Sequence, residues 1–221
     1  SISGFIVQGG GFTFNAGSSS RWAAIQTQNP VKNEAKWSNV RGTSAMAKAQ
    51  NLPDSATSQW FINLADNSAG NAQLDLQNKG YTVFGQVTGT GMSIADNINK
   101  LPTATVASLP DVPLRNYSAT DISQNTPVTS NHLVIIESVT VINADPNSAA
   151  GLNPVPNTAI SKPGNQTGNS GSSGGSFGGL ALLMLTIVTR DRAVRGFGFH
   201  SLAIGGHQHR SHQTKAAEAL R

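Results

Sequence analysis

The sequence predicts a mainly β protein, either a barrel or a sandwich of short strands, with a single helix. Short apolar runs that contain β-branched or aromatic residues alternate with longer polar loops. Such runs are typical of strands, and only one stretch has the periodicity of an amphipathic helix. The length of 221 residues favours one domain with a sizeable core. Cysteine is absent, which excludes a disulfide framework, a Cys-based zinc site and a thiol nucleophile.

Five runs are expected to form strands, and one stretch a helix. The first strand, at residues 5–8, ends at Gly9 to Gly11, where no Gly-Lys-Ser/Thr follows and no helix begins. These glycines therefore favour a backbone turn over a phosphate-binding loop. The helix is predicted at residues 92–99, whose apolar residues fall near one face, with Pro102 just beyond. The other strands are expected at residues 44–47, 59–63, 81–87 and 133–142, and the last of these, LVIIESVTVI, is the strongest β-branched run in the chain.

The net charge of +4 is confined to the C-terminal end of the chain. Residues 190–221 contain six basic and two acidic residues, together with four of the five histidines. Residues 1–189 contain nine of each charge. Because this main part has no excess of positive charge to bind a phosphate backbone, no nucleic-acid partner is expected.

Composition divides the chain into four parts. Residues 1–143 form the predicted domain, and residues 144–179 are rich first in Pro and Asn and then in Gly and Ser, as in flexible linkers. Residues 180–192 combine a short apolar segment with a basic cluster, and residues 193–221 form a basic tail that contains histidines. The linker and tail are expected to be disordered. No apolar run of 18 residues or more is present, which argues against a conventional membrane-spanning helix.

No residue cluster points to metal, cofactor or nucleophilic chemistry. His207, His209 and His212 have the spacing of metal ligands, but they lie in a tail without a visible scaffold to orient them. His132 is the only histidine among residues 1–189, and the carboxylates there are widely separated. No metal and no cofactor are therefore predicted.

Five ordered segments carry a family resemblance. They are GFIVQGGGF (4–12), NEAKWSNVRGTSAMAKA (33–49), DSATSQWFINLADN (54–67), LD (74–75) and GYTVFGQV (80–87). Together they resemble the cyclophilin-type peptidyl-prolyl cis–trans isomerases, the bacterial group in particular, and the resemblance extends over residues 1–143. It implies an eight-stranded antiparallel β-barrel capped by two helices, with a proline-binding pocket on the outside.

The resemblance also implies which residues form that pocket. An apolar floor would receive the proline ring, two glutamines would hold the substrate backbone, and Lys48 would contribute its backbone to the groove. Gln73 stands where many members have an aromatic residue at the pocket rim, and Trp60 would point to the opposite face of its strand, into the core. The floor residues are Phe5, Ile6, Phe61 and Leu74, the glutamines are Gln8 and Gln59, and the other lining residues are Ala47, Lys48 and Tyr81. Judged by residue type and spacing alone, the same side chains are ordinary core and surface residues.

A pocket of this kind suits bond rotation rather than bond cleavage. Amide resonance sets a barrier of roughly 18–20 kcal/mol to rotation about an X–Pro bond. A catalyst has to bind the twisted amide more tightly than either planar form, which requires neither a nucleophile nor a metal. In the family, an arginine within a Phe-His-Arg triplet donates a hydrogen bond to the prolyl nitrogen.

The resemblance places that arginine immediately before the position that matches Ser1. We therefore expect an N-terminally truncated member of the family, without its first two strands, its first helix and most of its third strand. The barrel would be incomplete and no catalytic residue would be present. Because a preorganised donor contributes orders of magnitude to a rate, this stretch alone is expected to be inactive while its parent protein is active.

The leading expectation is a prolyl isomerase that assists the folding of exported proteins, with proline-containing peptides and unfolded exported proteins as partners. Two alternatives stay open: a non-catalytic proline-peptide binding module or holdase, and a surface-anchored structural module. Residues 177–192 resemble the GlyGly-type C-terminal sorting signals of some Gram-negative bacteria. That resemblance implies a periplasmic, cell-surface or secreted protein and a transient contact with a membrane or sorting protease. A cytoplasmic location is the alternative, and a monomer is expected.

Overall fold

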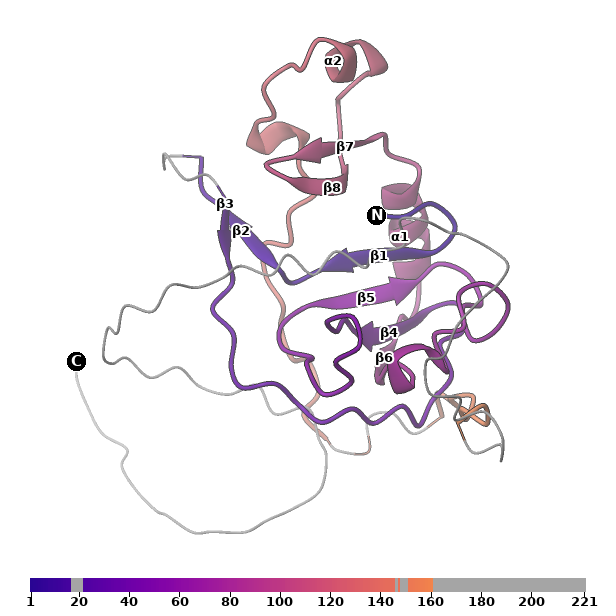
Figure 1. Cartoon of the computed structure of the whole chain (residues 1–221). Coiled ribbons are helices and arrows are strands. Elements are labelled where there is room, and N and C mark those ends of the chain that lie inside the picture. The colour runs from indigo at the N-terminus through magenta and orange to yellow at the C-terminus, as the bar shows by residue number, and fades with distance from the viewer. Residues whose placement is uncertain (17–21, 146, 148–150, 161–221) are drawn as a thin grey trace, which may run out of the picture.

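Four short strands form the central antiparallel sheet. The computed structural model describes residues 1–16, 22–145, 147 and 151–160 (Figure 1). The order of strands in the sheet is β1 (Ile6–Gly9), β5 (Trp60–Asn63), β4 (Thr43–Met46) and β6 (Val83–Gln86). Every neighbouring pair is antiparallel. These strands correspond to four of the five predicted runs, and the mainly β fold class is confirmed; closure into a barrel stays a prediction.

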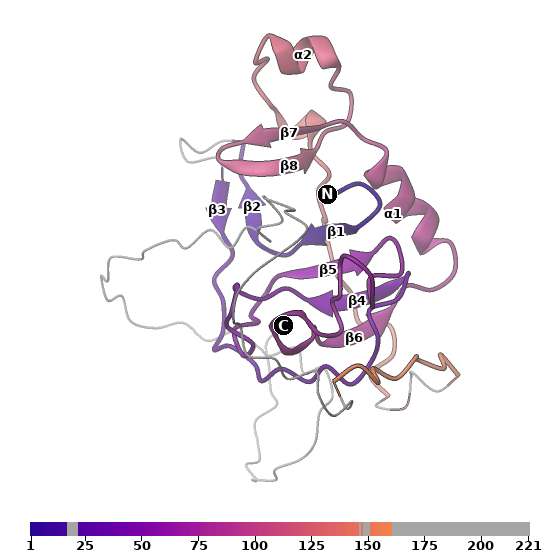
Figure 2. The same cartoon turned by 45° about the vertical axis from the view of Figure 1, so that its right-hand side comes forward.

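Two hairpins that were not predicted extend the fold beyond this sheet. The first pairs β2 (Phe12–Phe14) with β3 (Trp22–Ala24), and the second pairs β7 (Thr103–Val106) with β8 (Leu109–Pro113). In Figures 1 and 2 the second hairpin lies beyond β1, at the opposite end of the molecule from β6. Each of these strands has only three to five residues, as do those of the central sheet, but β3, β7 and β8 contain Ala, Asp or Pro, which are depleted in strands.

The predicted helix is present as α1 (Gly91–Asn99), which contacts β1 at the side of the sheet (Figure 2). Arg41, in the turn before β4, fixes the helix by donating from Nη2 to both carboxylate oxygens of Asp96, at 3.0 and 2.8 Å. A second, shorter helix, α2 (Ala119–Ser123), begins with a capping box between Ser118 and Asp121. Two 3₁₀ turns complete the described elements, η1 (Gln77–Lys79) and η2 (Ser130–His132). No helix within the described ranges is long and apolar enough to cross a membrane.

The prediction of a strand at residues 133–142 is wrong. Only Leu133 pairs, in an isolated bridge with Leu114, and the rest of the run has no regular secondary structure. Most of its large apolar side chains are exposed, up to 98% for Ile142. β-Propensity reflects how well a side chain fits a paired, half-buried surface. Among the described residues no strand offers this run a ladder of backbone partners, so its composition alone does not make it a strand.

Trp60 lies on the opposite face of β5 from Phe61, as strand alternation predicted, but it does not belong to the buried core. Its half-buried indole covers the turn after β1. A Cβ atom on Gly10 would lie 3.1 Å from Cδ1 of the indole and 2.4 Å from the Ser58 carbonyl oxygen. Gly10 also has a φ of +80°, so both the backbone and the close approach require glycine there.

A buried polar cluster connects the loops at one end of the sheet. The Asp75 carboxylate accepts hydrogen bonds from the Ser38 hydroxyl and, at 2.8 Å, from the Asn39 backbone N–H. The Asn39 amide donates to the carboxylate as well, at 3.1 Å, and to the Tyr81 carbonyl, at 3.2 Å. The members of this Asp75 network are Ser38, Asn39, Thr43, Asn63, Asn67 and Asp75, all of them buried. Because these side-chain donors have acceptors inside the cluster or on the neighbouring backbone, the polar groups are buried without losing their hydrogen bonds.

Part of the predicted linker is held against the domain. Pro156 pairs with Trp37 in an isolated antiparallel bridge, and Asn157 is buried. The remainder of the predicted linker beyond Ile160, the apolar segment and the tail lie outside the described residues. The domain boundaries themselves stay a prediction.

We expect Asp75→Asn to destabilise the protein by about 1–2 kcal/mol, because the donors of Asn39 lose their charged acceptor and the new NH₂ faces the Ser38 hydroxyl, which now donates. Urea denaturation followed by fluorescence or circular dichroism measures the change. Asp66→Asn is the matched control, since the Asp66 carboxylate accepts only the exposed hydrogen bonds of Ser68. The control should change stability by less than about 0.5 kcal/mol. Equal effects of the two substitutions would contradict a structural role for the Asp75 network.

Candidate functional site

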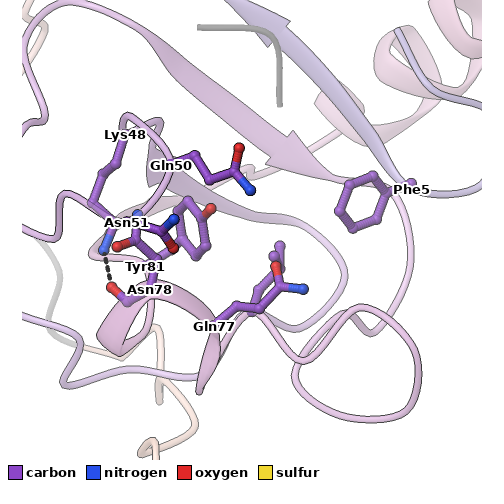
Figure 3. Close-up of a pocket in the computed structure, with 8 residues that line it drawn as sticks. Phe5, Lys48, Gln50, Asn51, Gln77, Asn78 and Tyr81 are labelled. Atoms are coloured by element: carbon purple, nitrogen blue, oxygen red, sulfur yellow. Dashed lines mark hydrogen bonds between the residues drawn. The ribbon is translucent and has the colours of Figure 1, made fainter. Parts of the chain in front are cut away.

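A cavity of about 220 Å³ opens between three separate parts of the chain (Figure 3). One wall comes from the residue before β1, a second from the loop that follows β4, and the third from the loop that contains η1. The lining residues are Phe5, Lys48, Gln50, Asn51, Leu74, Gln77, Asn78 and Tyr81. The cavity therefore combines three apolar or aromatic side chains with four amides and one amine.

Four of the predicted pocket residues line this cavity, namely Phe5, Lys48, Leu74 and Tyr81. Three others, Ile6, Ala47 and Phe61, belong to the same cluster of buried residues as Phe5, Leu74 and Tyr81. The remaining two, Gln8 and Gln59, hydrogen-bond to each other through their side chains, from Nε2 of Gln8 to Oε1 of Gln59 at 2.8 Å. The structure thus brings the predicted residues into one region, with the two glutamines outside the cavity lining.

The apolar floor is packed through an aromatic pair. The rings of Phe61 and Tyr81 meet edge to face, with centroids 5.7 Å apart. Phe61 is fully buried on β5, opposite Ala45 of β4 in the sheet. The small Ala45 leaves room for the Phe61 ring, which in turn supports Tyr81 from below. The floor is therefore a continuation of the protein core.

Lys48 has a role that the sequence did not predict. Its side chain is only 1% exposed, and its Nζ donates to the Asn78 carbonyl at 2.9 Å and to the Gly80 carbonyl at 2.5 Å. The same Nζ lies 4.7 Å from the centroid of the Tyr81 ring, within cation–π range. Burial lowers the pKa of Lys48 to about 8, and the charge of Asp54 opposes part of that shift. Burial also raises the pKa of Tyr81, so its phenol stays neutral at physiological pH.

The loop from Leu74 to Tyr81 has an unusual backbone. Asn78 and Lys79 both have positive φ angles, of 51° and 62°, which are costly for residues other than glycine. Three contacts hold them: Lys48 binds the Asn78 carbonyl, Asn33 donates through Nδ2 to the Lys79 carbonyl at 2.8 Å, and the Asn78 amide donates to Ala49 at 2.8 Å. The loop is thereby fastened to the opposite wall of the cavity.

Four amide residues of the lining were missed by sequence reasoning. They occur as two Gln-Asn pairs, Gln50-Asn51 and Gln77-Asn78, one on each loop. The same dipeptide also occurs at residues 28–29 and 124–125, so the sequence offered no signal that singles out these two loops. Gln73, expected at the pocket rim, is not among the lining residues; its backbone is left-handed, with φ of +46°. Within the described ranges no group of three or more His, Asp or Glu side chains could hold a metal ion, and the His207 to His212 cluster lies outside them.

Comparison with known proteins shows the family of the chain. A family model described as cyclophilin type peptidyl-prolyl cis-trans isomerase/CLD matches residues 1–119. A peptidyl-prolyl cis-trans isomerase of Acinetobacter baylyi is 46% identical over 114 residues, which are 51% of this chain and 55% of the relative. Peptidyl-prolyl cis-trans isomerase A of Dickeya dadantii is 46% identical over 115 residues, again 51% of this chain and 55% of the relative.

A third relative is covered more fully. Peptidyl-prolyl cis-trans isomerase B of Escherichia coli is 40% identical over 143 residues, which are 63% of this chain and 72% of the relative. The chain spans about half the length of the first two relatives. With more than half of its residues matched by the family model, the chain belongs to the cyclophilin-type peptidyl-prolyl cis-trans isomerase family.

Proposed function

We propose that this protein binds X-Pro segments of other polypeptides in the cavity and that the whole protein accelerates rotation about the X–Pro bond. One observation carries the proposal: Phe5, Leu74 and Tyr81 line the same cavity as four amide side chains. The apolar residues suit a proline ring, which has no hydrogen-bonding group of its own. The amides both donate and accept hydrogen bonds, so they suit the peptide groups on either side of the ring.

The lining supports binding more directly than it supports catalysis. Lys48 is the one cation among the described lining residues, and its Nζ is already bound to two carbonyl groups. Catalysis by stabilising the twisted amide requires a donor that is free to reach the prolyl nitrogen. We therefore assign peptide binding to the described residues and infer that rapid isomerisation needs a further donor, such as the family's arginine.

The names of the relatives support an isomerase, and the resemblance of residues 177–192 to a sorting signal supports exported proteins as its substrates. We propose on these grounds that the protein assists folding outside the cytoplasm. A non-catalytic proline-peptide binding module is the second candidate, favoured by the commitment of Lys48 to the loop carbonyls.

Phe5→Ala should raise the dissociation constant of an Ala-Ala-Pro-type peptide about tenfold or more, because it removes the ring that closes one side of the cavity. Titration followed by NMR shifts or calorimetry measures the constant. Ile94→Ala is the matched control, since Ile94 is an exposed apolar residue of α1 that does not line the cavity. Circular dichroism verifies that both variants are folded. Equal affinities for the two variants would contradict binding in this cavity.

In a prolyl-peptide isomerisation assay, we expect the chain of residues 1–221 to bind the peptide without a large acceleration of the reaction. A version preceded by the family's N-terminal third, ending in Phe-His-Arg, should be fast. Changing that arginine to alanine should lower its rate by about 10²–10³-fold. Full isomerase activity of residues 1–221 alone would show that their own side chains provide the hydrogen-bond donor to the prolyl nitrogen.

Lys48 makes stability depend on pH in a defined window. Since the pKa is about 8 in the folded protein and 10.5 without the fold, unfolding takes up a proton between these values, and stability rises with pH. We expect the unfolding free energy of the wild type, relative to Lys48→Met, to increase by about 1 kcal/mol per pH unit above pH 8. Urea denaturation at several pH values measures this difference. Lys100→Met, at the exposed end of α1, should leave the profile unchanged, and a flat difference for Lys48→Met would refute the lowered pKa.

A further inference from the structure

Residues 155–160, which we name the C-terminal clip, bind along the outside of the domain. The Ser38 N–H donates to the Val155 carbonyl at 2.8 Å, and the Asn157 N–H donates to the Lys36 carbonyl at 2.9 Å. Trp37 and Pro156 face each other between these two hydrogen bonds. The clip therefore adds a short antiparallel strand-like pairing to a segment of the domain, as extended peptides do in many complexes.

One side chain anchors the clip in the buried polar cluster. Asn157 is 8% exposed, and its Nδ2 donates to the Asp75 carbonyl at 2.9 Å. Its Oδ1 accepts from the Ala159 N–H, also at 2.9 Å. Asp75 directly follows Leu74 in the cavity lining, and its carboxylate is held by Asn39. The Asn157 side chain thus contacts the N-terminal end of the loop from Leu74 to Tyr81.

The end of the clip reaches the other end of the same loop. Ile160 lies so close to Gly80 that a Cβ atom on Gly80 would be 2.9 Å from the Ile160 Cδ1. Gly80 precedes Tyr81 of the lining, and its carbonyl accepts the hydrogen bond from Lys48. The clip therefore touches the loop from outside at Asp75 and Gly80, while Lys48 holds it from inside.

This arrangement matters because the loop between these two contacts contains the left-handed residues Asn78 and Lys79. Backbone of this kind persists only when its surroundings determine it strongly. Few backbone hydrogen bonds attach the clip itself, so it can open without unfolding of the sheet. If the clip detached, the loop would keep only its other contacts, such as the hydrogen bonds from Lys48 and Asn33.

We propose that the C-terminal clip is a positioning element of the peptide-binding cavity, which keeps Leu74 and Tyr81 in place for a prolyl ligand. This inference rests on the proposed function. Because clip and ligand favour the same loop conformation, each strengthens the binding of the other. Sequence beyond the family match, which ends at residue 119, therefore contributes to the affinity of the cavity.

The test uses the full chain with Asn157→Ala, and Thr158→Ala as the matched control. Thr158 lies in the clip but is exposed. We expect Asn157→Ala to raise the dissociation constant of an Ala-Ala-Pro-type peptide about fivefold and to speed hydrogen exchange at the Gly80 and Tyr81 amides. Exchange in β4 and β5 should stay at the wild-type rate, which separates a local effect from general unfolding. Thr158→Ala should match the wild type in both measurements.

A disulfide provides the rescue. Trp37 and Pro156 form a non-hydrogen-bonded antiparallel pair, whose close Cα atoms suit a disulfide, and the chain has no other cysteine. Adding W37C and P156C to Asn157→Ala should restore the affinity under oxidising conditions, and a reductant should remove it again. If Asn157→Ala itself unfolds, Ile160→Ala, which shortens a partly exposed side chain, provides the milder variant for the same measurements.

The outcomes distinguish the two proposals. Failure of the unaltered chain to bind the prolyl peptide contradicts the proposed function and, with it, the role of the clip. Normal peptide binding by the unaltered chain together with unchanged affinity and exchange in the clip variants overturns the clip alone. A loss of affinity that the oxidised disulfide does not restore also overturns it, because the Asn157 side chain would then act by some route other than holding the clip.

Discussion

The buried carboxylate of Asp75 is the constraint on which the cavity depends. A carboxylate inside a protein needs hydrogen-bond donors, and here they come from Ser38 and Asn39, more than thirty residues earlier in the chain. Their approach forces the segment before β4 against the loop after β5. The same asparagine amide lies within hydrogen-bond reach of the carbonyls of Leu74 and Tyr81, at 3.4 and 3.2 Å.

The network also reaches the third apolar residue of the cavity. Asn67 donates through Nδ2 to the Phe5 carbonyl at 3.0 Å and to the Asn63 amide oxygen at 2.7 Å. Phe5, Leu74 and Tyr81 therefore each have a backbone carbonyl bound to a buried asparagine, although they come from distant parts of the chain. The apolar surface that suits a proline ring is positioned by polar groups behind it, and no regular secondary structure is needed at those three positions.

Sequence reasoning succeeded where short apolar runs form strands between turn residues, or where apolar residues repeat along a helix. β1, β4, β5, β6 and α1 were predicted from such local patterns, and the family resemblance brought Phe5, Lys48, Leu74 and Tyr81 to one place. It failed where the outcome depends on a partner far away in the chain. The run at residues 133–142 has strong β-propensity but no ladder partner among the described strands, and the burial of Lys48 depends on carbonyls of a loop thirty residues later. Neither condition is encoded in a local window.

The docking of Asn157 has a practical consequence for how the protein is dissected. Composition favours a domain boundary at residue 143, where the chain becomes rich in proline and asparagine. A recombinant version that stops there would discard the partner of the Asp75 carbonyl and expose the polar edge at Lys36 and Ser38 to solvent and to other chains. The C-terminal end of a recombinant version for crystallisation or affinity measurements is therefore better placed after Ile160.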